Sequence, residues 1–492
     1  MGKKSNLCKD LTYDECELTI LRQAVDKAEK IKGTKQLSSP ELKNIIEIVE
    51  GFLKNKNNIC YGGTAINNIL PKQDQFYDRN IEIPDYDFFS TTPLEDAKNL
   101  ADIYYKKGFD EVEAKAGMHY GTYKVFVNFI PVADITLLTP EIYNNMKKEA
   151  ITVSGILYAP PNYLRMAMYL ELSRPDGDIS RWEKVLKRIT LLNKHYPLMG
   201  KNCNTLDFQR GMENKKDQDT LYEVTKNALI DEGVIFFGGL ANTLYSRYMP
   251  RKMARKLGKV PDFDVLSEDA ELTADLIKEK IQQAGFKKVN IFYHQKIGEI
   301  ISEHYEIRVG DETICFIYTP LACHSYNSVT IDNKSINIAS IDTMLSFYLA
   351  FLYSDRKYYD KNRILCMSQY LFIVQQKNRL AQKGLLRRFS INCYGKQETL
   401  ETMRAEKANK FIELKQQRNG KEYEEWFLRY IPRNNPKVNR ENQKTKSKTK
   451  KILPKTPELN KEEQSYKKPK TRRRRKKRRK ATRRNKGFFG LF

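Results

Sequence analysis

The sequence lacks any apolar run long enough to cross a bilayer. After Asp342 the longest uncharged stretch extends only from 343 to 354, whereas a membrane-spanning helix needs roughly 20 apolar residues. The chain opens with Met, Gly and two Lys residues and no apolar segment, so we expect no signal peptide. Residue 6 is Asn6, where the myristoylation pattern requires Ser or Thr. We therefore expect no membrane partner.

Cysteine and histidine are sparse and scattered, which excludes several classes of site. No C-x-x-C pair or Cys/His cluster with zinc spacing occurs. Five histidines leave little material for histidine-based catalysis. We expect reduced thiols in an intracellular protein. The eight cysteines are at positions 8, 16, 60, 203, 315, 323, 366 and 393.

Positive charge is abundant but confined largely to one end. Residues 437–492 contain 24 Lys and Arg against four Glu, so they carry +20 of the net +26. Such a segment cannot build a core, and we expect a disordered basic tail that binds a polyanion. Retention of RNA is one role for it. A nuclear import signal and an arm for packaged genome are alternatives, and the terminal GFFGLF is a candidate docking peptide.

A glycine turn lies between a short apolar strand and a helix. Residues 59–61 form the apolar run, Gly62 and Gly63 interrupt it, and residues 65–70 have helical character. Backbone N–H groups at such a turn, together with the helix dipole, favour an anion. Thr64 adds a hydroxyl that contacts phosphate or caps the helix. The segment therefore predicts a phosphate site.

Two carboxylates follow on the next strand. Because side chains alternate along a strand, Asp85 and Asp87 share one face while Tyr86 points to the other. Like charges this close repel, and a divalent cation with oxygen ligands relieves the repulsion. A third acid, Asp134, interrupts the otherwise apolar segment FIPVADITLL, where an unpaired charge is unfavourable. We predict that the three acids share a metal site.

These segments resemble a known family. YGGT (61–64), PDYD (84–87) and VAD (132–134) are similar to the signatures of the polymerase-β-type nucleotidyltransferase superfamily. Within it they look most like the poly(A) polymerase catalytic subunits of large DNA viruses: poxviruses, the African swine fever group and giant viruses of amoebae. The resemblance is close over residues 40–195. The 21 residues between Gly63 and Asp85 exceed the gap in many superfamily members, and the role of the loop 71–83 stays open.

The resemblance implies a reaction and its participants. Asp85, Asp87 and Asp134 would hold two Mg²⁺ or Mn²⁺ ions, and Gly62 and Gly63 would cradle the triphosphate of ATP. The reaction implied is template-independent addition of AMP to the 3′ end of mRNA. RNA and ATP are then partners, and a homodimer or a viral processivity or capping partner is a further expectation. The implied location is the host cytoplasm or the virion, with a nuclear location left open.

A second copy of the motifs follows about 176 residues later. FFGGLANTLYSRYM (236–249) and PDFDVLSED (261–269) repeat YGGTAINNIL and PDYDFFS. An ungapped pairing of the strands ADITLLTP and TICFIYTP sets Asp134 against Ile314, and Leu240 replaces Thr64. We predict that the second copy has lost its chemistry. The alternative is a second active centre that uses Asp311 or Glu312.

Two helices connect the copies, over residues 162–172 and 180–194. The second presents Arg181, Lys184 and Arg188 on one side. These cations either form a solvated face or reach substrate phosphates, as phosphoryl transfer requires. We name Arg165 and Lys184 as nucleotide-binding candidates, with Arg188 as the alternative to Lys184.

The predicted fold is α+β with two tandem nucleotidyltransferase-like domains, each a mixed sheet flanked by helices, the second degenerate. Helices from about 341 to 430 are expected to cover the second domain. Two rival functions remain: another nucleotidyltransferase, which makes oligoadenylate or modifies a protein or small molecule, and a non-catalytic RNA-binding scaffold or virion protein. The expected divisions are an N-terminal helical segment (1–40), the catalytic domain (41–198), the degenerate domain (199–345), a helical region (346–436) and the basic tail (437–492).

Overall fold

The computed structural model describes residues 12–37, 39–77, 84–213, 215–255 and 258–439. Nearly all of the basic tail, the terminal GFFGLF and the end of the loop 71–83 lie outside the described residues. In the part of the chain that the structure describes, no helix has the length and apolarity needed to span a membrane.

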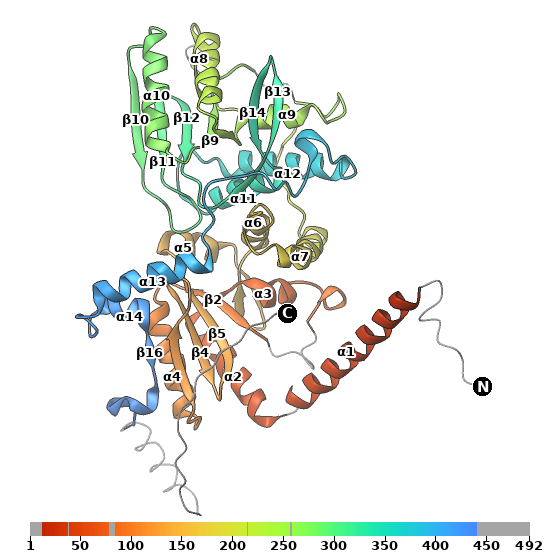
Figure 1. Ribbon diagram of the computed structural model, residues 1–492, viewed down its shortest axis with the longest axis vertical. Helices are drawn as coiled ribbons and strands as arrows, with labels where there is room; N and C mark the ends of the chain where they lie inside the picture. The colour runs from red at the N-terminus through yellow and green to blue at the C-terminus, as the bar shows by residue number, and fades with distance from the viewer. Residues whose placement is uncertain (1–11, 38, 78–83, 214, 256–257, 440–492) are drawn as a thin grey trace, which may run out of the picture. The chain divides into compact units, whose positions relative to one another are not determined.

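The first half of the chain contributes seven strands of an eight-stranded sheet, and a strand from near residue 430 joins its edge. These strands are β1 (Ile59–Cys60), β2 (Tyr86–Ser90), β3 (Val112–Ala116), β4 (Thr122–Val127), β5 (Ile130–Leu137), β6 (Ile151–Val153), β7 (Ile156–Tyr158) and β16 (Arg429–Tyr430). Their order across the sheet is β16-β3-β4-β5-β2-β1-β7-β6. Strands β16, β4, β5 and β2 of this sheet are labelled in Figure 1. Strand β2 pairs parallel with β5 and antiparallel with β1.

Apolar helix faces pack on this sheet. The helix over Pro93–Lys106 buries Leu94, Ala97 and Leu100 at helical spacing, and its Tyr104 hydroxyl donates to the carbonyl of Ile45, 2.7 Å away. The two connecting helices predicted at 162–172 and 180–194 are present. The helical elements are α1 (Tyr13–Leu37), α2 (Pro40–Lys56), α3 (Gly62–Ile69), η2 (Lys72–Asp74), α4 (Pro93–Lys106), α5 (Pro140–Lys148), α6 (Pro161–Leu172), η3 (Ile179–Arg181) and α7 (Trp182–His195).

The second half builds a second eight-stranded sheet. Its strands are β8 (Ile235–Phe236), β9 (Phe263–Leu266), β10 (Val289–His294), β11 (His304–Val309), β12 (Glu312–Tyr318), β13 (His324–Ile331), β14 (Lys334–Ala339) and β15 (Cys393–Tyr394). The helices in the same stretch are α8 (Gln218–Asp231), α9 (Gly239–Ser246), α10 (Ala270–Gln283), α11 (Ile341–Phe351), α12 (Lys361–Lys377) and η4 (Gly384–Leu386).

The strand order of the second sheet repeats that of the first. Strands β10-β11-β12-β9-β8-β14-β13 follow one another as β3-β4-β5-β2-β1-β7-β6 do, with the same parallel and antiparallel pairs. The only additions are the edge strands β16 and β15 among the described strands. The duplication inferred from the repeated motifs is therefore a duplication of fold.

The sequence predicted that helices from about 341 to 430 cover the second domain. The structure shows this to be wrong for the later elements of that region. Helix α11 packs against α12 and against α6 of the first half. The later elements return to the first sheet, where α14 contacts β3 and η5 contacts α4. Because this return depends on pairing between residues more than 300 positions apart, local sequence patterns did not reveal it. These elements are α13 (Leu400–Leu414), α14 (Lys421–Phe427) and η5 (Pro432–Asn434).

Within the described residues, the expectation of reduced thiols is wrong for Cys203, Cys366, Cys323 and Cys393. Cys203 is bonded to Cys366 and Cys323 to Cys393, whereas Cys60 and Cys315 are buried free thiols. The paired residues are 163 and 70 positions apart, so no spacing pattern in the sequence marks them.

Candidate active site

The three predicted acids come together on one face of the first sheet. Strands β2 and β5 are neighbours, and Asp87 lies directly opposite Asp134 in their register. Asp85 precedes β2 by one residue and is exposed, while Asp87 and Asp134 are half-buried. Parallel pairing of two strands far apart in sequence therefore brings the acids together.

The glycine turn lies against Asp87. Gly62 has a φ of +72°, which favours glycine, and a Cβ there would be 2.5 Å from Oδ2 of Asp87. The N–H of Tyr61 donates to the carbonyl of Asp87 at 2.9 Å. Thr64 neither caps the helix nor points into solvent: its buried hydroxyl donates to the carbonyl of Asp85 at 2.7 Å. The turn and the acidic strand are thus held as one unit.

Burial and mutual repulsion make the carboxyl groups of Asp85 and Asp87 hard to ionise. Burial first, and then the charges of Asp85 and Asp134, together raise the pKa of Asp87 to about 7. Burial, and then the charge of Asp134, also raise the pKa of Asp85. A site that accumulates this much negative charge on oxygen atoms has the donor set that a hard divalent cation prefers.

A lysine not anticipated from the sequence partly compensates this charge. Lys124 on β4 lies opposite Asp134 in the register, and its ammonium forms an ion pair with the carboxylate of Asp134. The positive charge of Lys124 lowers the pKa of both Asp85 and Asp87, although burial and repulsion outweigh it. The alternation of side chains along β4 was the available signal, but the neighbouring strand had first to be known.

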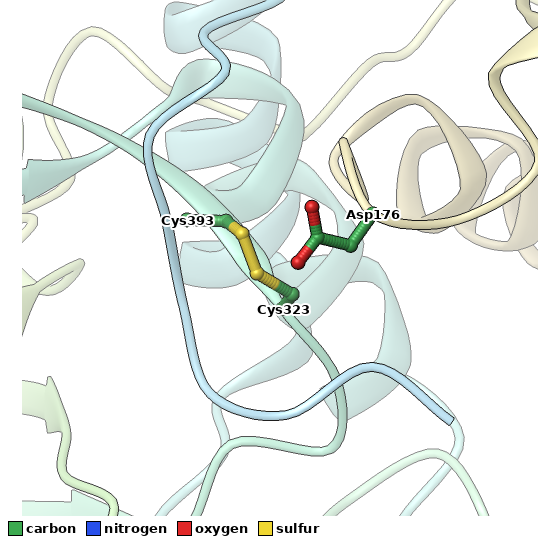
Figure 2. A group of neighbouring side chains, drawn as sticks. All are labelled: Asp176, Cys323 and Cys393. Carbon is green, nitrogen blue, oxygen red and sulfur yellow. A yellow bond between two sulfur atoms is a disulfide. The ribbon is translucent and has the colours of Figure 1, made fainter. Parts of the chain in front are cut away.

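The three acids share one face of the sheet, but their carboxylate oxygens do not all lie within 4.8 Å of one another. Among the described residues, the set of possible ligand atoms found within 4.8 Å of one another is Asp176, Cys323 and Cys393. That set is no metal centre, because its two sulfurs are joined in a disulfide and offer no thiolates (Figure 2). Asp85, Asp87 and Asp134 remain the set whose chemistry suits Mg²⁺ or Mn²⁺.

Arg188, and not Lys184, reaches the glycine turn. A Cβ on Gly63 would be 2.8 Å from Nη2 of Arg188 and 2.6 Å from the hydroxyl of Tyr77. Arg188 donates to that hydroxyl and stacks over Phe76, 5.1 Å from the ring centre. Lys184 is exposed on α7. Tyr77, in the loop whose role the sequence left open, was not anticipated.

The position of Arg165 does not support a nucleotide-binding role. Its side chain is 1 % exposed, and its guanidinium donates to the side-chain oxygens of Asn162 and Asn193 and to the carbonyl of Tyr196. These bonds link α6 to α7 and their C-terminal connection. The arginine stabilises the interior because its donors are engaged there.

The second copy holds its two acids with an internal cation. Asp262 and Asp264 occupy the places of Asp85 and Asp87, and the guanidinium of Arg210 is ion-paired with both. The backbone N–H of Arg210 also donates to Asp262 at 2.9 Å, and its guanidinium lies over the ring of Phe316. Burial lowers the pKa of Arg210, but the two carboxylates outweigh this effect and raise it above the ordinary value.

The strand register corrects the position of the lost third acid. Asp264 lies opposite Phe316, just as Asp87 lies opposite Asp134, so Phe316 and not Ile314 is the counterpart. Glu312 begins β12 four residues earlier, about 13 Å along the strand from Phe316. The alternative of a second centre that uses Asp311 or Glu312 stays a prediction. The loss of the third acid stands, at a different position.

Comparisons with known proteins found a matching family model and similar sequences. The family model described as poly(A) polymerase catalytic subunit matches residues 47–178. The putative poly(A) polymerase catalytic subunit of Acanthamoeba polyphaga mimivirus is 33% identical over 162 residues, which is 32% of this chain and 27% of that protein. The corresponding African swine fever virus protein is 32% identical over 180 residues, 35% of this chain and 38% of that protein.

A solved structure extends the likeness to both halves. The crystal structure of the Megavirus polyadenylate synthase superposes with a TM-score of 0.71 at 21% identity, covering 92% of each chain. This likeness confirms the predicted α+β fold with two sheets. The sequence matches confirm the predicted resemblance over the segment that contains the turn and the three acids, while the alignments span well under half the length of those relatives.

Proposed function

We propose that this chain is a polynucleotide adenylyltransferase that adds AMP from ATP to RNA 3′ ends without a template. The observation that carries the proposal is the register of β2 and β5, which sets Asp87 opposite Asp134 beside a glycine turn. The resemblance of residues 47–178 to poly(A) polymerase catalytic subunits supports it. The choice of ATP over other nucleotides rests on that resemblance.

The residues of the site divide the chemistry among them. Asp85, Asp87 and Asp134 would hold two divalent ions, Mg²⁺ or Mn²⁺, and Gly62, Gly63 and Arg188 face the place where a triphosphate would lie. When bound, the ions supply positive charge that favours an ionised primer hydroxyl and a departing pyrophosphate. The carboxylates position both groups for in-line displacement, so the side chains need not act as a general base.

A primer-extension assay tests the proposal. Purified full-length protein is incubated with labelled RNA and each nucleoside triphosphate separately, with Mg²⁺ or Mn²⁺. We expect a ladder with ATP and little extension with the other three. Extension by no nucleotide overturns the proposal in favour of a scaffold, and labelling of protein or a small molecule without RNA extension favours the other nucleotidyltransferases.

The duplicated fold provides a matched pair of variants. We expect Asp87→Asn to lower the extension rate by at least roughly 100-fold, because the ions lose a charged ligand. Asp264→Asn makes the same change at the equivalent strand position of the second copy and should leave the rate within about twofold. Equal losses in the two variants contradict the assignment of catalysis to the first copy.

The wider setting follows from the same proposal. The basic segment 437–492 would hold the growing RNA through salt-dependent phosphate contacts. Deleting residues 440–492 should therefore shorten the products at physiological salt and flatten the salt dependence of RNA binding.

The proposed protein partner is a second copy of this chain or a viral processivity or capping protein, and the proposed location is the host cytoplasm or the virion. Sedimentation of the purified chain tests whether two copies associate.

A further inference from the structure

A row of charged residues crosses the first sheet on the face of the acids. Lys115 on β3 is opposite Lys124 on β4, Lys124 is opposite Asp134, and Asp134 is opposite Asp87. Residues directly opposite on neighbouring strands point to the same face. Lys124 is therefore the cation of this row that adjoins the acids, and Lys115 lies one strand farther away.

Lys124 is held loosely enough to be displaced. Its ammonium is paired with Asp134, yet 39% of its side chain is exposed, compared with 19% for Asp134. Its charge also acts on Asp85 and Asp87. A lysine has a flexible stem and a single point charge, so it can leave one carboxylate without breaking a network of bonds. The ammonium of Lys124 can therefore move away from Asp134 when another cation binds there.

The second copy has the same strand arrangement but no lysine at the position equivalent to Lys124. In its register Glu306 stands where Lys124 does and Phe316 stands where Asp134 does. Both members of the pair are replaced together. The remaining acids, Asp262 and Asp264, are held by Arg210, whose side chain is only 18% exposed and comes from outside the sheet. The fold alone does not require a lysine at this position.

We propose that Lys124 is a displaceable counter-ion of the acid triad that makes uptake of a second divalent cation depend on the arrival of the nucleoside triphosphate. The inference rests on the proposed function. Three ionised carboxylates and one ammonium carry a formal charge of −2, which one divalent cation neutralises. Binding of a second cation then needs the negative charge of the triphosphate. Without the ammonium the acids retain a negative charge after the first cation binds.

A Mn²⁺ titration tests the proposal without turnover. Calorimetry or electron paramagnetic resonance measures how many Mn²⁺ ions bind and how tightly. The full chain is held near pH 8 without RNA, with and without a non-hydrolysable ATP analogue. We expect the wild-type chain to bind one Mn²⁺ alone and a second with the analogue. Lys124→Met keeps the stem and removes the charge, so it should bind the first Mn²⁺ at least about tenfold more tightly. It should also take up the second without nucleotide.

Two further variants sharpen the result. Lys115→Met removes a charge from the same row one strand away and should bind Mn²⁺ as the wild type does. Lys124→Arg keeps the charge and should not tighten binding, which tests the charge independently if the methionine variant fails to fold. Unchanged or weaker Mn²⁺ binding by Lys124→Met overturns the counter-ion role alone. If the wild-type chain binds no Mn²⁺ either with or without the ATP analogue, the two-ion function is overturned as well.

Discussion

At the scale of single residues, the site depends on close approach between backbone and carboxylate. Gly62 combines a φ of +72° with a Cβ position 2.5 Å from Oδ2 of Asp87. An added methyl group would strain the turn and push the carboxylate out of place. The acid and the glycine are consequently interdependent, although 25 positions separate them in the chain.

Gly62→Ala should therefore reduce RNA extension by at least about 100-fold and weaken Mn²⁺ binding, because both depend on the position of Asp87. Initial rates and a Mn²⁺ titration measure the two effects. Gly51→Ala is the matched control, because Gly51 lies in α2 with nothing within 4 Å of its Cβ position. It should keep full activity, and unaltered Mn²⁺ binding by Gly62→Ala would contradict the close contact.

The raised pKa of Asp87, about 7, predicts an unusual pH dependence of stability. A carboxyl group that keeps its proton in the folded state up to pH 7, but only to about pH 4 when unfolded, stabilises the fold at low pH. This stability is lost as pH rises through the folded pKa. With a chelator present, the thermal midpoint should fall between about pH 5 and pH 8.

Two observations check that interpretation of Asp87. Asp87→Asn should flatten this part of the pH profile, since the asparagine does not titrate. Added Mg²⁺ should raise the thermal midpoint of the wild type more at pH 8 than at pH 6, because it binds the ionised acids. A thermal midpoint that rises steadily with pH in chelator contradicts the assignment.

At the scale of elements, the packing of α7 decides which of its cations lies against the glycine turn. Arg188 and Lys184 are four residues apart on one helix, yet the guanidinium of Arg188 alone lies against Gly63 and Tyr77 in the described contacts. The helical period places both on one side of the helix but does not say which end meets the turn. That choice comes from packing of α7 on α6.

Arg188→Ala should raise the KM for ATP about tenfold or more, because a charge-assisted contact to phosphate is lost. Lys184→Ala removes a charge from the same helix and should change KM by less than about twofold. Steady-state kinetics with varied ATP at saturating RNA separates the variants. Equal effects would indicate a diffuse basic surface in place of a specific contact.

At the scale of the whole molecule, the two copies of the fold differ in how their acids are neutralised. In the first copy the partly exposed Lys124 pairs with Asp134, whereas in the second the largely buried Arg210 pairs with both Asp262 and Asp264. Arg210 neutralises Asp262 and Asp264 in a largely buried setting, and burial raises the pKa of Asp264 to about 6 despite the arginine. The second copy therefore contributes folded surface and support, and its acids need no external cation.

Arg210→Met should lower the free energy of unfolding by about 3 kcal/mol or more, because Asp262 and Asp264 lose the guanidinium that neutralises them. Urea denaturation followed by fluorescence measures this loss. Adding Asp264→Asn to Arg210→Met should recover part of the stability by removing one of the uncompensated charges. If Arg210→Met is as stable as the wild type, the ion pair is not structural.

The sequence by itself determined the local chemistry: the glycine turn, the acids at 85, 87 and 134, and the repeat of the motifs. These follow from short-range rules of strand alternation and backbone freedom, which act within a few residues. Only the tertiary structure decided which strands are neighbours. That pairing placed Lys124 beside Asp134 and Phe316 in place of Ile314. Packing outside the sheets placed Arg210 beside Asp262 and Arg165 in the interior. Long-range contacts join residues whose separation in the chain carries no periodic signal, so the cations that complete each site became visible only in the fold.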